Sequence, residues 1–389
     1  MIDKSEIFIY EYVGSNRDPN LFFNTSKHTI FLTTYETITR DIEQREIYKI
    51  SFYLVILDEA TKIKNVNSLR TKSIKKLNSL YRFVITGTPI ENRPIELWSI
   101  FDFLMKGHLG NKSKFLEIEK EIVENNNQNY IDLIVKKIKP FVLRRKKEDV
   151  AKDLPDKIIL QQWCELTDEQ KYYYNKIIEE KDKLLELDSF NLLKILEKLK
   201  QLCIHPALVN YKMDPILGRS EKFDLAYELI MEIIEKNEKC INFSEYLNPL
   251  NFIEELLILN GIKYIKITGA VQNRQELIDL FNNDDSYKVA ILSLRATSHG
   301  ITLTSANNAI LLDLWWNPTV INQAIDRIHR IGQQRTVYVY QILIKGSIEE
   351  KILDLLKNKL SLSNKIMETI YFEGGRFTKE ELIEILKPI

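Results

Sequence analysis

The chain has 389 residues, of which 44% are hydrophobic and 28% are charged, so it is long enough for two or three globular domains. Its 55 basic residues balance its 55 acidic residues. A net charge of zero argues against a basic nucleic-acid arm, an acidic tail or a polyanion binder that acts through a long-range field, although it does not exclude a locally basic groove.

The cysteines and the N-terminal residues indicate a cellular compartment. The three cysteines stand far apart and include no C-x-x-C pair, so they predict neither a disulfide framework nor a zinc knuckle. The first residues are charged where a signal peptide requires an apolar core, and no apolar run approaches the roughly 18 residues of a membrane span. We therefore expect a cytoplasmic protein without a membrane partner.

Short apolar runs alternate with helical patterns near the start of the chain. Strands are predicted in 28–35, 52–60 and 81–89, and each run ends in polar or small residues. Between the last two, 71–80 repeats at helical spacing. Strand–helix–strand units with buried strands are typical of a parallel sheet that helices cover.

A second series of strands is predicted later in the chain, after a helical block. The block, 94–211, is rich in Glu and Lys, and 349–389 is typical of amphipathic helices. The strands of the second series are predicted in 239–246, 263–270, 288–294, 306–314 and 336–343. We expect an α/β fold with two lobes and a helical block inserted between them or protruding from them.

Two adjacent carboxylates, Asp58 and Glu59, follow directly on the second predicted strand. Ligands of open α/β sheets bind beyond the carboxyl ends of the strands. There such a pair can hold a hydrated Mg²⁺ and orient a water molecule against a phosphate. The alternative is that the pair caps the next helix.

Small residues follow the next strand, where Thr86, Gly87 and Thr88 would let the backbone approach a ligand or form an ordinary strand–helix turn.

Further on, Gln323, Arg327 and Arg330 fall at i, i+4 and i+7 of a predicted helix and therefore share one face. Two guanidinium groups on one face suit a pair of arginine fingers acting on a triphosphate. A surface helix with ion pairs to Asp326 is the alternative.

The densest basic run, 143–147, contains Arg144 and Arg145. It could contact phosphates, but charge runs more commonly form a solvated helix face. The run by itself therefore favours no particular ligand.

Taken together and in order, these segments resemble the Swi/Snf-type branch of the superfamily-two helicase-like ATPases. The resemblance spans about 29–351, and the ending of the chain is most similar to the prokaryotic members. The motifs that carry it are ILDEATKIKN, FVITGTPIENRPIELWSIFDFL, FVLRRKKEDVAKDLP, LKQLCIHPAL, INFSEY, ITGAVQNRQELIDLF, ILSLRATSHGITLTSANNAILLDLWWNP and QAIDRIHRIGQQRTVYVYQIL.

The resemblance implies two RecA-like parallel-sheet lobes of the P-loop NTPase type, the first incomplete on its N-terminal side. It implies a DNA-stimulated ATPase that uses ATP and Mg²⁺ to move along double-stranded DNA without unwinding it. A DNA-bound protein substrate is a further expected partner, and a prokaryotic member would associate with the nucleoid. The domains expected from it are a partial first lobe at 1–105, a helical insertion and brace at 106–215, a second lobe at 216–350 and a helical tail at 351–389.

The resemblance also assigns roles to single residues. Asp58 would coordinate Mg²⁺, Glu59 would position the attacking water, and Arg327 and Arg330 would be the arginine fingers. The nucleotide-binding set would add Gln323, Gly300 and Asp326. The residues expected to bind DNA or to couple it to the nucleotide are Thr33, Thr34, Thr86, Gly87, Thr88, Ser244 and Ser293, together with Arg144 and Arg145 as a brace between the lobes.

One motif of the family is absent from the sequence. No segment reads G-x-x-x-x-G-K-[ST], and 110–113 has Asn where the glycine–lysine step is required. Without that loop the β- and γ-phosphates lose their main ligand. We therefore expect the C-terminal part of a translocase that is inactive alone. It would be either half of a split motor, in which an upstream chain supplies the missing half, or a truncated product. The alternative is a non-catalytic module, derived from such a motor, that binds DNA or docks a partner.

Overall fold

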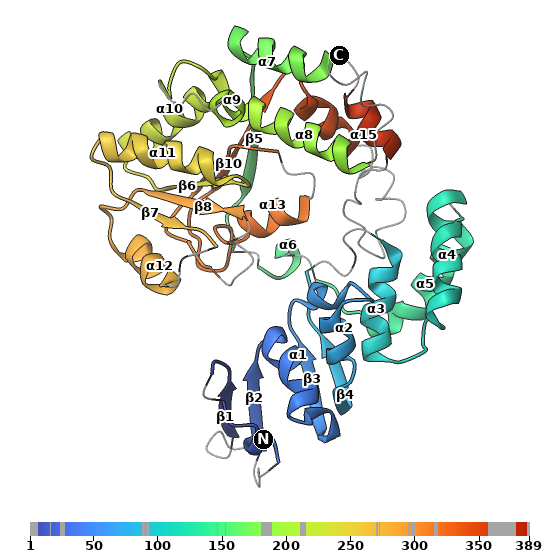
Figure 1. Cartoon of the computed structure of the whole chain (residues 1–389). Helices are drawn as coiled ribbons and strands as arrows, with labels where there is room; N and C mark the ends of the chain where they lie inside the picture. The colour runs from blue at the N-terminus through green and yellow to red at the C-terminus, as the bar shows by residue number, and fades with distance from the viewer. Residues whose placement is uncertain are drawn as a thin grey trace. The chain divides into compact units, whose positions relative to one another are not determined.

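The computed structural model describes residues 7–15, 17–23, 28–87, 90, 93–125, 127–145, 147–151, 153–179, 189–210, 215–269, 271, 273–294, 296, 301–314, 318–356 and 379–386. The chain forms two compact units (Figure 1): unit 1 lies within Met1–Leu143, and unit 2 lies within Arg144–Ser361 and Arg376–Ile389. No helix in the part of the chain that the structure describes is long and apolar enough to span a bilayer.

Unit 1 contains two pairs of parallel strands. Strand β1 (Ile7–Tyr12) pairs with β2 (His28–Thr33), and β3 (Ser51–Leu57) pairs with β4 (Asn78–Val84). Its α-helices are α1 (Tyr35–Gln44), α2 (Leu69–Ile74), α3 (Pro94–Leu104), α4 (Lys112–Asn125) and α5 (Gln128–Ile138), and its 3₁₀ helices are η2 (Pro19–Phe22), η3 (Ile47–Lys49), η4 (Ala60–Ile63) and η5 (Lys139–Phe141).

Side-chain caps and an apolar core explain where the helices of unit 1 begin. Helix α1 begins at Tyr35 because the hydroxyl of Thr34 accepts the backbone N–H of Thr37 at 3.1 Å. The buried side chains Ile38 and Ile42 of α1 pack with Leu57 of β3 in one core. Helices α3, α4 and α5 contribute to a second apolar core of the same unit.

Unit 2 is built around a six-stranded sheet with the order β5-β10-β9-β6-β8-β7, in which every strand pair is parallel. The strands are β5 (Lys157–Cys164), β6 (Cys240–Ser244), β7 (Tyr264–Ile267), β8 (Val289–Ser293), β9 (Asn308–Leu311) and β10 (Val337–Ile344). The helices are α6 (Lys147–Val150), α7 (Asp168–Glu179), α8 (Ser189–Ile204), α9 (Ala207–Asn210), α10 (Glu221–Glu235), α11 (Leu247–Leu259), α12 (Arg274–Asn283), α13 (Pro318–Ile325) and α15 (Lys379–Leu386).

Helices lie on both sides of the six-stranded sheet (Figure 1), and both faces of its inner strands β6, β8 and β9 are buried. In β8, Val289 and Ile291 belong to a core shared with α8, α10 and α11. The alternate residues Ala290 and Leu292 belong to a second core shared with α12 and α13. A strand buried on both faces has a continuous apolar sequence, which is the pattern that predicted this sheet.

The expected class, α/β with parallel sheets, is confirmed. The segment 106–215 is divided between the two compact units. We expected 106–215 to form one helical insertion. Instead α4 and α5 pack with α3 in unit 1, whereas α7 and α8 pack on the sheet of unit 2. Unit 2 therefore already begins at Arg144.

Two further segments belong to unit 2 against expectation. Strand β5 was not predicted, because its short apolar run 158–160 is followed by two glutamines; this edge strand exposes Ile159 and Trp163. The expected helical tail also contributes to the core of the unit, where Leu356, Leu382 and Ile385 are buried. Tertiary packing assigns both segments to the lobe.

Candidate functional site

The adjacent carboxylates lie where the sequence predicts, directly after the carboxyl end of β3. The exposed Asp58 accepts the backbone N–H of Glu59 at its Oδ1, at 2.9 Å. Its backbone carbonyl accepts the hydroxyl of Tyr35 at 2.7 Å, which joins the end of β3 to the start of α1. Burial, followed by the charges of Asp58 and Glu59, raises the pKa of Tyr35 well above its ordinary value, so the hydroxyl stays a donor at neutral pH.

Glu59 adopts a left-handed backbone conformation, with φ 50° and ψ 55°. For a residue other than glycine this conformation costs about 1–2 kcal/mol. The neighbouring backbone compensates, because Ala60 donates to the carbonyl of Ile85 at 3.2 Å and Ile85 donates to the carbonyl of Leu57 at 2.8 Å. Strained backbone conformations of this kind, which the surrounding structure maintains, are concentrated at functional sites.

The alternative interpretation of the pair as a helix cap has little support. Glu59 stands at the N-cap position of η4, but its side chain makes no capping hydrogen bond. The exposed carboxylate of Asp58 accepts the adjacent N–H of Glu59, which is not a helix N–H that needs a cap. The pair is therefore available to a ligand at this strand end.

The donor set at Asp58 suits one kind of metal ion. Among the described residues, no three His, Cys, Asp or Glu side chains gather closely enough to form a metal cage. Mg²⁺ is commonly held by one or two carboxylates together with water and substrate phosphates. The exposed Asp58 fits such an ion and not an all-protein site.

The expected coupling residues of unit 1 lie at the ends of β2 and β4. Thr33, the last residue of β2, and the following Thr34 are both exposed, and Thr33 donates its hydroxyl to the carbonyl of Tyr12 at 2.8 Å. Thr86 is half-buried and Gly87 is exposed after β4. Thr88 lies outside the described residues.

The predicted arginine helix of unit 2 is only partly helical, which corrects the expectation. Helix α13 ends at Ile325, so Gln323 lies on the helix, whereas Arg327 and Arg330 lie in the turns that follow it. The three side chains therefore do not share one helix face. The half-buried Arg327 gives its carbonyl to the N–H of Leu303 at 3.0 Å, and the exposed Arg330 donates to the hydroxyl of Thr302 at 3.0 Å.

Two side chains that the sequence pattern did not single out explain why the helix ends. The amide Nε2 of the buried Gln333 donates to the carbonyls of Thr304 and Ala306 at 3.1 and 2.7 Å. A ring nitrogen of His329 lies 2.7 Å from the carbonyl of Pro155. These contacts, with the left-handed Gly332, draw the chain away from the helical path.

Asp326 forms an ion pair, but the partner is Lys147 of α6 and not a neighbour on a surface helix, which was the expected alternative. Lys147 Nζ lies 2.6 Å from Asp326 Oδ1 and donates to the carbonyl of His329 at 3.2 Å. Lys147 belongs to the basic run, whose neighbouring residues Arg144 and Arg145 are exposed. Gly300, the remaining residue of the predicted nucleotide set, lies outside the described residues.

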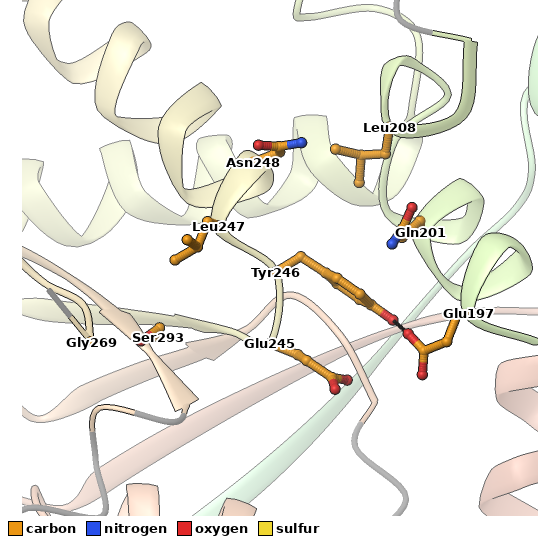
Figure 2. Close-up of a pocket in the computed structure, with 9 residues that line it drawn as sticks. All are labelled: Glu197, Gln201, Leu208, Glu245, Tyr246, Leu247, Asn248, Gly269 and Ser293. Carbon is orange, nitrogen blue, oxygen red and sulfur yellow. Dashed lines mark hydrogen bonds between the residues drawn. The ribbon is translucent and has the colours of Figure 1, made fainter. Parts of the chain in front are cut away.

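A cavity of about 550 Å³ opens at the carboxyl edge of the six-stranded sheet (Figure 2). Ser293 lines it at the end of β8, and Gly269 lines it after β7. The remaining lining residues come from α8, from Leu208 of α9 and from the turn that leads into α11: Glu197, Gln201, Leu208, Glu245, Tyr246, Leu247 and Asn248.

Ser244 does not line this cavity. It is fully buried at the end of β6, donates its hydroxyl to Asp313 Oδ2 at 2.5 Å and accepts the N–H of Tyr246 at 3.1 Å. In this conformation its side chain shapes the turn and reaches no external ligand. Its predicted contact with DNA would thus require the turn to rearrange, whereas Ser293 already lines the cavity.

One face of the β3–β4 pair is apolar and exposed beside the acidic pair. We call it the open face, and it consists of Leu54, Ile56, Tyr81, Phe83 and Ile85, which are 39%, 55%, 49%, 60% and 58% exposed. Parallel sheets are almost always covered on both faces. An apolar sheet face of this kind marks an interaction surface.

Comparisons with known proteins agree with this architecture. The SNF2-related domain matches residues 3–208, and the helicase conserved C-terminal domain matches residues 221–332. The chain is 36% identical over 367 residues to an uncharacterized ATP-dependent helicase of Mycoplasma pneumoniae, a match that covers 92% of this chain and 34% of the relative. It is 29% identical over 424 residues to the TATA-binding protein-associated factor MOT1 of Saccharomyces cerevisiae, which covers 92% of this chain and 22% of the relative.

Among solved structures, the SWI2/SNF2 ATPase core of Sulfolobus solfataricus in complex with dsDNA matches with 31% identity and a TM-score of 0.50. That match covers 99% of this chain and 82% of the solved chain, and it confirms the two expected RecA-like lobes. The chain spans about a third or less of the length of the two curated relatives. Because the first domain alone matches more than half of the residues, the chain belongs to the SNF2 family of helicase-like ATPases.

Proposed function

We propose that this chain is the C-terminal part of an ATP-dependent motor that moves along double-stranded DNA, and that it carries the hydrolysis-side residues of that motor. The observation that carries the proposal is the Asp58–Glu59 pair, held at the carboxyl end of β3 with Glu59 in a strained backbone conformation. Family membership supports ATP as the nucleotide, since relatives are named as ATP-dependent.

Each residue of the pair has a separate role in this proposal. Asp58 would hold Mg²⁺ through water, and the ion would neutralise charge on the phosphates of ATP. Glu59 would orient the attacking water, a role that needs its carboxylate fixed in direction. The left-handed backbone of Glu59 supports that role because it fixes where the side chain leaves the chain.

The arginine segment supplies the positive charge that phosphoryl transfer requires. Arg327 and Arg330 would be the arginine fingers, and Gln323 would assist from the end of α13. The ion pair between Lys147 and Asp326, at 2.6 Å, holds the turn in which Arg327 lies. Asp326 would thus support the arginines indirectly.

The phosphate-binding loop must come from elsewhere. The sequence has no G-x-x-x-x-G-K-[ST] segment, and in the similar stretch 110–113 the amine of Lys112 donates to Asn67 Oδ1 at 2.8 Å. The uncovered open face supports a partner segment that would add strands and helices to unit 1. We propose that such a segment supplies the loop, and that the 389-residue chain alone does not turn over ATP.

Double-stranded DNA is the proposed track. A structural relative is described in complex with dsDNA, and another relative is named as a factor associated with TATA-binding protein. The strand ends that carry Thr33, Thr34 and Thr86 in unit 1 would contact the duplex, and so would the strand end that carries Ser293 in unit 2. A DNA-bound protein would be the substrate that the motor remodels.

A phosphate-release assay with duplex DNA tests this proposal. We expect no turnover by the chain alone, and turnover after it is mixed with a polypeptide that carries the phosphate loop and preceding strands of a relative. Glu59→Gln should abolish that turnover, whereas Glu46→Gln should not, since Glu46 has a similar left-handed backbone (φ 53°) away from the strand end. Turnover by the chain alone that Glu59→Gln removes would refute the need for a partner. DNA binding without restored turnover would favour a non-catalytic module.

A further inference from the structure

Helix α8 holds the turn 244–246, which leads from β6 into α11 at the edge of the cavity (Figure 2). Lys200 Nζ lies 2.8 Å from Glu245 Oε2, and the hydroxyl of Tyr246 donates to Glu197 Oε2. Glu197 and Lys200 are three residues apart on α8 and therefore share one face of the helix. One helix face thus contacts two consecutive residues of the turn.

Asp313, just beyond β9, holds the same turn from the other side. Its Oδ2 accepts the hydroxyl of Ser244 at 2.5 Å. Its two carboxylate oxygens also accept the N–H of Glu245, at 3.2 and 3.0 Å. Asp313 is 3% exposed, so these bonds form in a water-poor environment that strengthens them.

The charges at the cavity present a problem for a surface that binds nucleic acid. Glu197 and Glu245 both line the cavity, and carboxylates repel phosphate groups. The amine of Lys200, which is 1% exposed, offsets the charge of Glu245. The hydroxyl of Tyr246 bonds one oxygen of Glu197.

We propose that Lys200 is a positioning residue for the phosphate backbone of duplex DNA at this cavity, where it neutralises Glu245 and fixes the turn 244–246. This inference rests on the proposed function, because it assumes that the carboxyl edge of the sheet faces DNA. Lys200 is too buried to touch the duplex and acts through Glu245. Removal of Lys200 leaves the carboxylate of Glu245 uncompensated beside Ser293.

Unit 2 contains a matched control for a purely structural role. Lys222 is 0% exposed and pairs with Glu349 at 2.5 Å, a pair whose residues do not line the cavity. Both lysines are therefore buried in ion pairs of the same unit. A loss of DNA affinity caused only by lower stability would appear in Lys222→Met as well as in Lys200→Met.

The test is fluorescence anisotropy of a labelled DNA duplex with the full chain over a range of salt concentrations, at a temperature where each variant is folded. Lys200→Met should weaken binding about tenfold. It should also reduce the slope of the logarithm of the binding constant against the logarithm of the salt concentration, by about 0.9 for each phosphate that the protein no longer neutralises. The double variant Lys200→Met/Glu245→Gln should recover the affinity, because position 245 then carries no charge that needs Lys200. Lys222→Met should bind as the wild type does.

The possible results separate this inference from the function on which it rests. A wild-type chain that does not bind duplex DNA would refute the proposed DNA track. Wild-type binding with unchanged affinity in Lys200→Met would refute the positioning role alone. Where Lys200→Met does not fold, the comparison is between Glu245→Gln and the double variant. Equal DNA affinities of these two variants support the action of Lys200 through Glu245. A lower DNA affinity of the double variant refutes that action.

Discussion

The ion pair between Lys222 and Glu349 gives a direct prediction of how strongly unit 2 depends on one buried charge. The two side chains are 0% and 2% exposed. Glu349 Oε2 also accepts the N–H of Ile344, the last residue of β10, at 2.9 Å. The pair therefore joins α10 to the end of β10 across 127 positions of sequence.

Lys222→Met should lower the free energy of unfolding of unit 2 by about 3–5 kcal/mol, because it leaves a buried carboxylate without its cation. At roughly 2–4 °C per kcal/mol for a domain of this size, the melting temperature should fall by about 6–20 °C. Lys222→Met/Glu349→Gln should recover most of this loss. The amide oxygen of Gln can still accept the N–H of Ile344, and no unpaired charge remains.

Differential scanning calorimetry of the full chain measures both variants. Lys236→Met is the matched control, because Lys236 follows α10 directly and forms a 3.7 Å pair with Glu232 while 67% exposed. Ion pairs exposed to this extent contribute little to stability, so the melting temperature of Lys236→Met should match that of the wild type. Equal small effects of Lys222→Met and Lys236→Met, or a double variant less stable than Lys222→Met, would refute the reasoning.

Three further predictions concern single residues. Burial lowers the pKa of His205 to about 4, so the unfolded chain takes up the proton first as pH falls. Stability should therefore decline by about 3 kcal/mol between pH 6.5 and 4, and urea unfolding of His205→Gln should show a smaller decline; an equal decline would contradict the assignment. Glu59→Gly should raise the free energy of unfolding of unit 1 by about 1 kcal/mol through relief of the left-handed strain, whereas a loss of stability in urea unfolding would show that the side chain is a net stabiliser. Phe83→Asp should abolish restored turnover with the loop-carrying polypeptide while the exposed Leu69→Asp does not; equal turnover in both would exclude the open face as the docking surface.

The acidic strand end could be predicted because its signal is local. The apolar run before Asp58 makes β3, and strand geometry then places Asp58 at the carboxyl end. The sequence did not predict the left-handed backbone of Glu59, which depends on the hydrogen bonds of Ala60 and Ile85 across two strands. Such bonds exist only after β3 and β4 have paired.

The arginine segment shows the limit of periodicity. Gln323, Arg327 and Arg330 have helical spacing, yet Gln333 and His329 bond to carbonyls far from them in sequence and end the helix at Ile325. Helical spacing describes only local preference, which tertiary hydrogen bonds override.

The sequence did not reveal the partners of Lys200 and Lys147. Lys200 lies in a Glu- and Lys-rich stretch that resembles any solvated helix, and its partner Glu245 is 45 positions away. Lys147 is 182 positions from the carbonyl of His329 to which it donates. Neither partner can be identified without the fold.

Local sequence patterns were enough to predict the α/β class, the order of the motifs and the residue types at the strand ends, because buried parallel strands and their flanking residues leave such patterns. Zero net charge excluded long-range attraction to DNA, and length alone suggested two or three domains. The placement of β5, α7 and α8 in unit 2, and the neutralisation of a cavity carboxylate by Lys200, emerged only from the folded chain. These features depend on contacts between distant segments, whose energies appear only when the chain has packed.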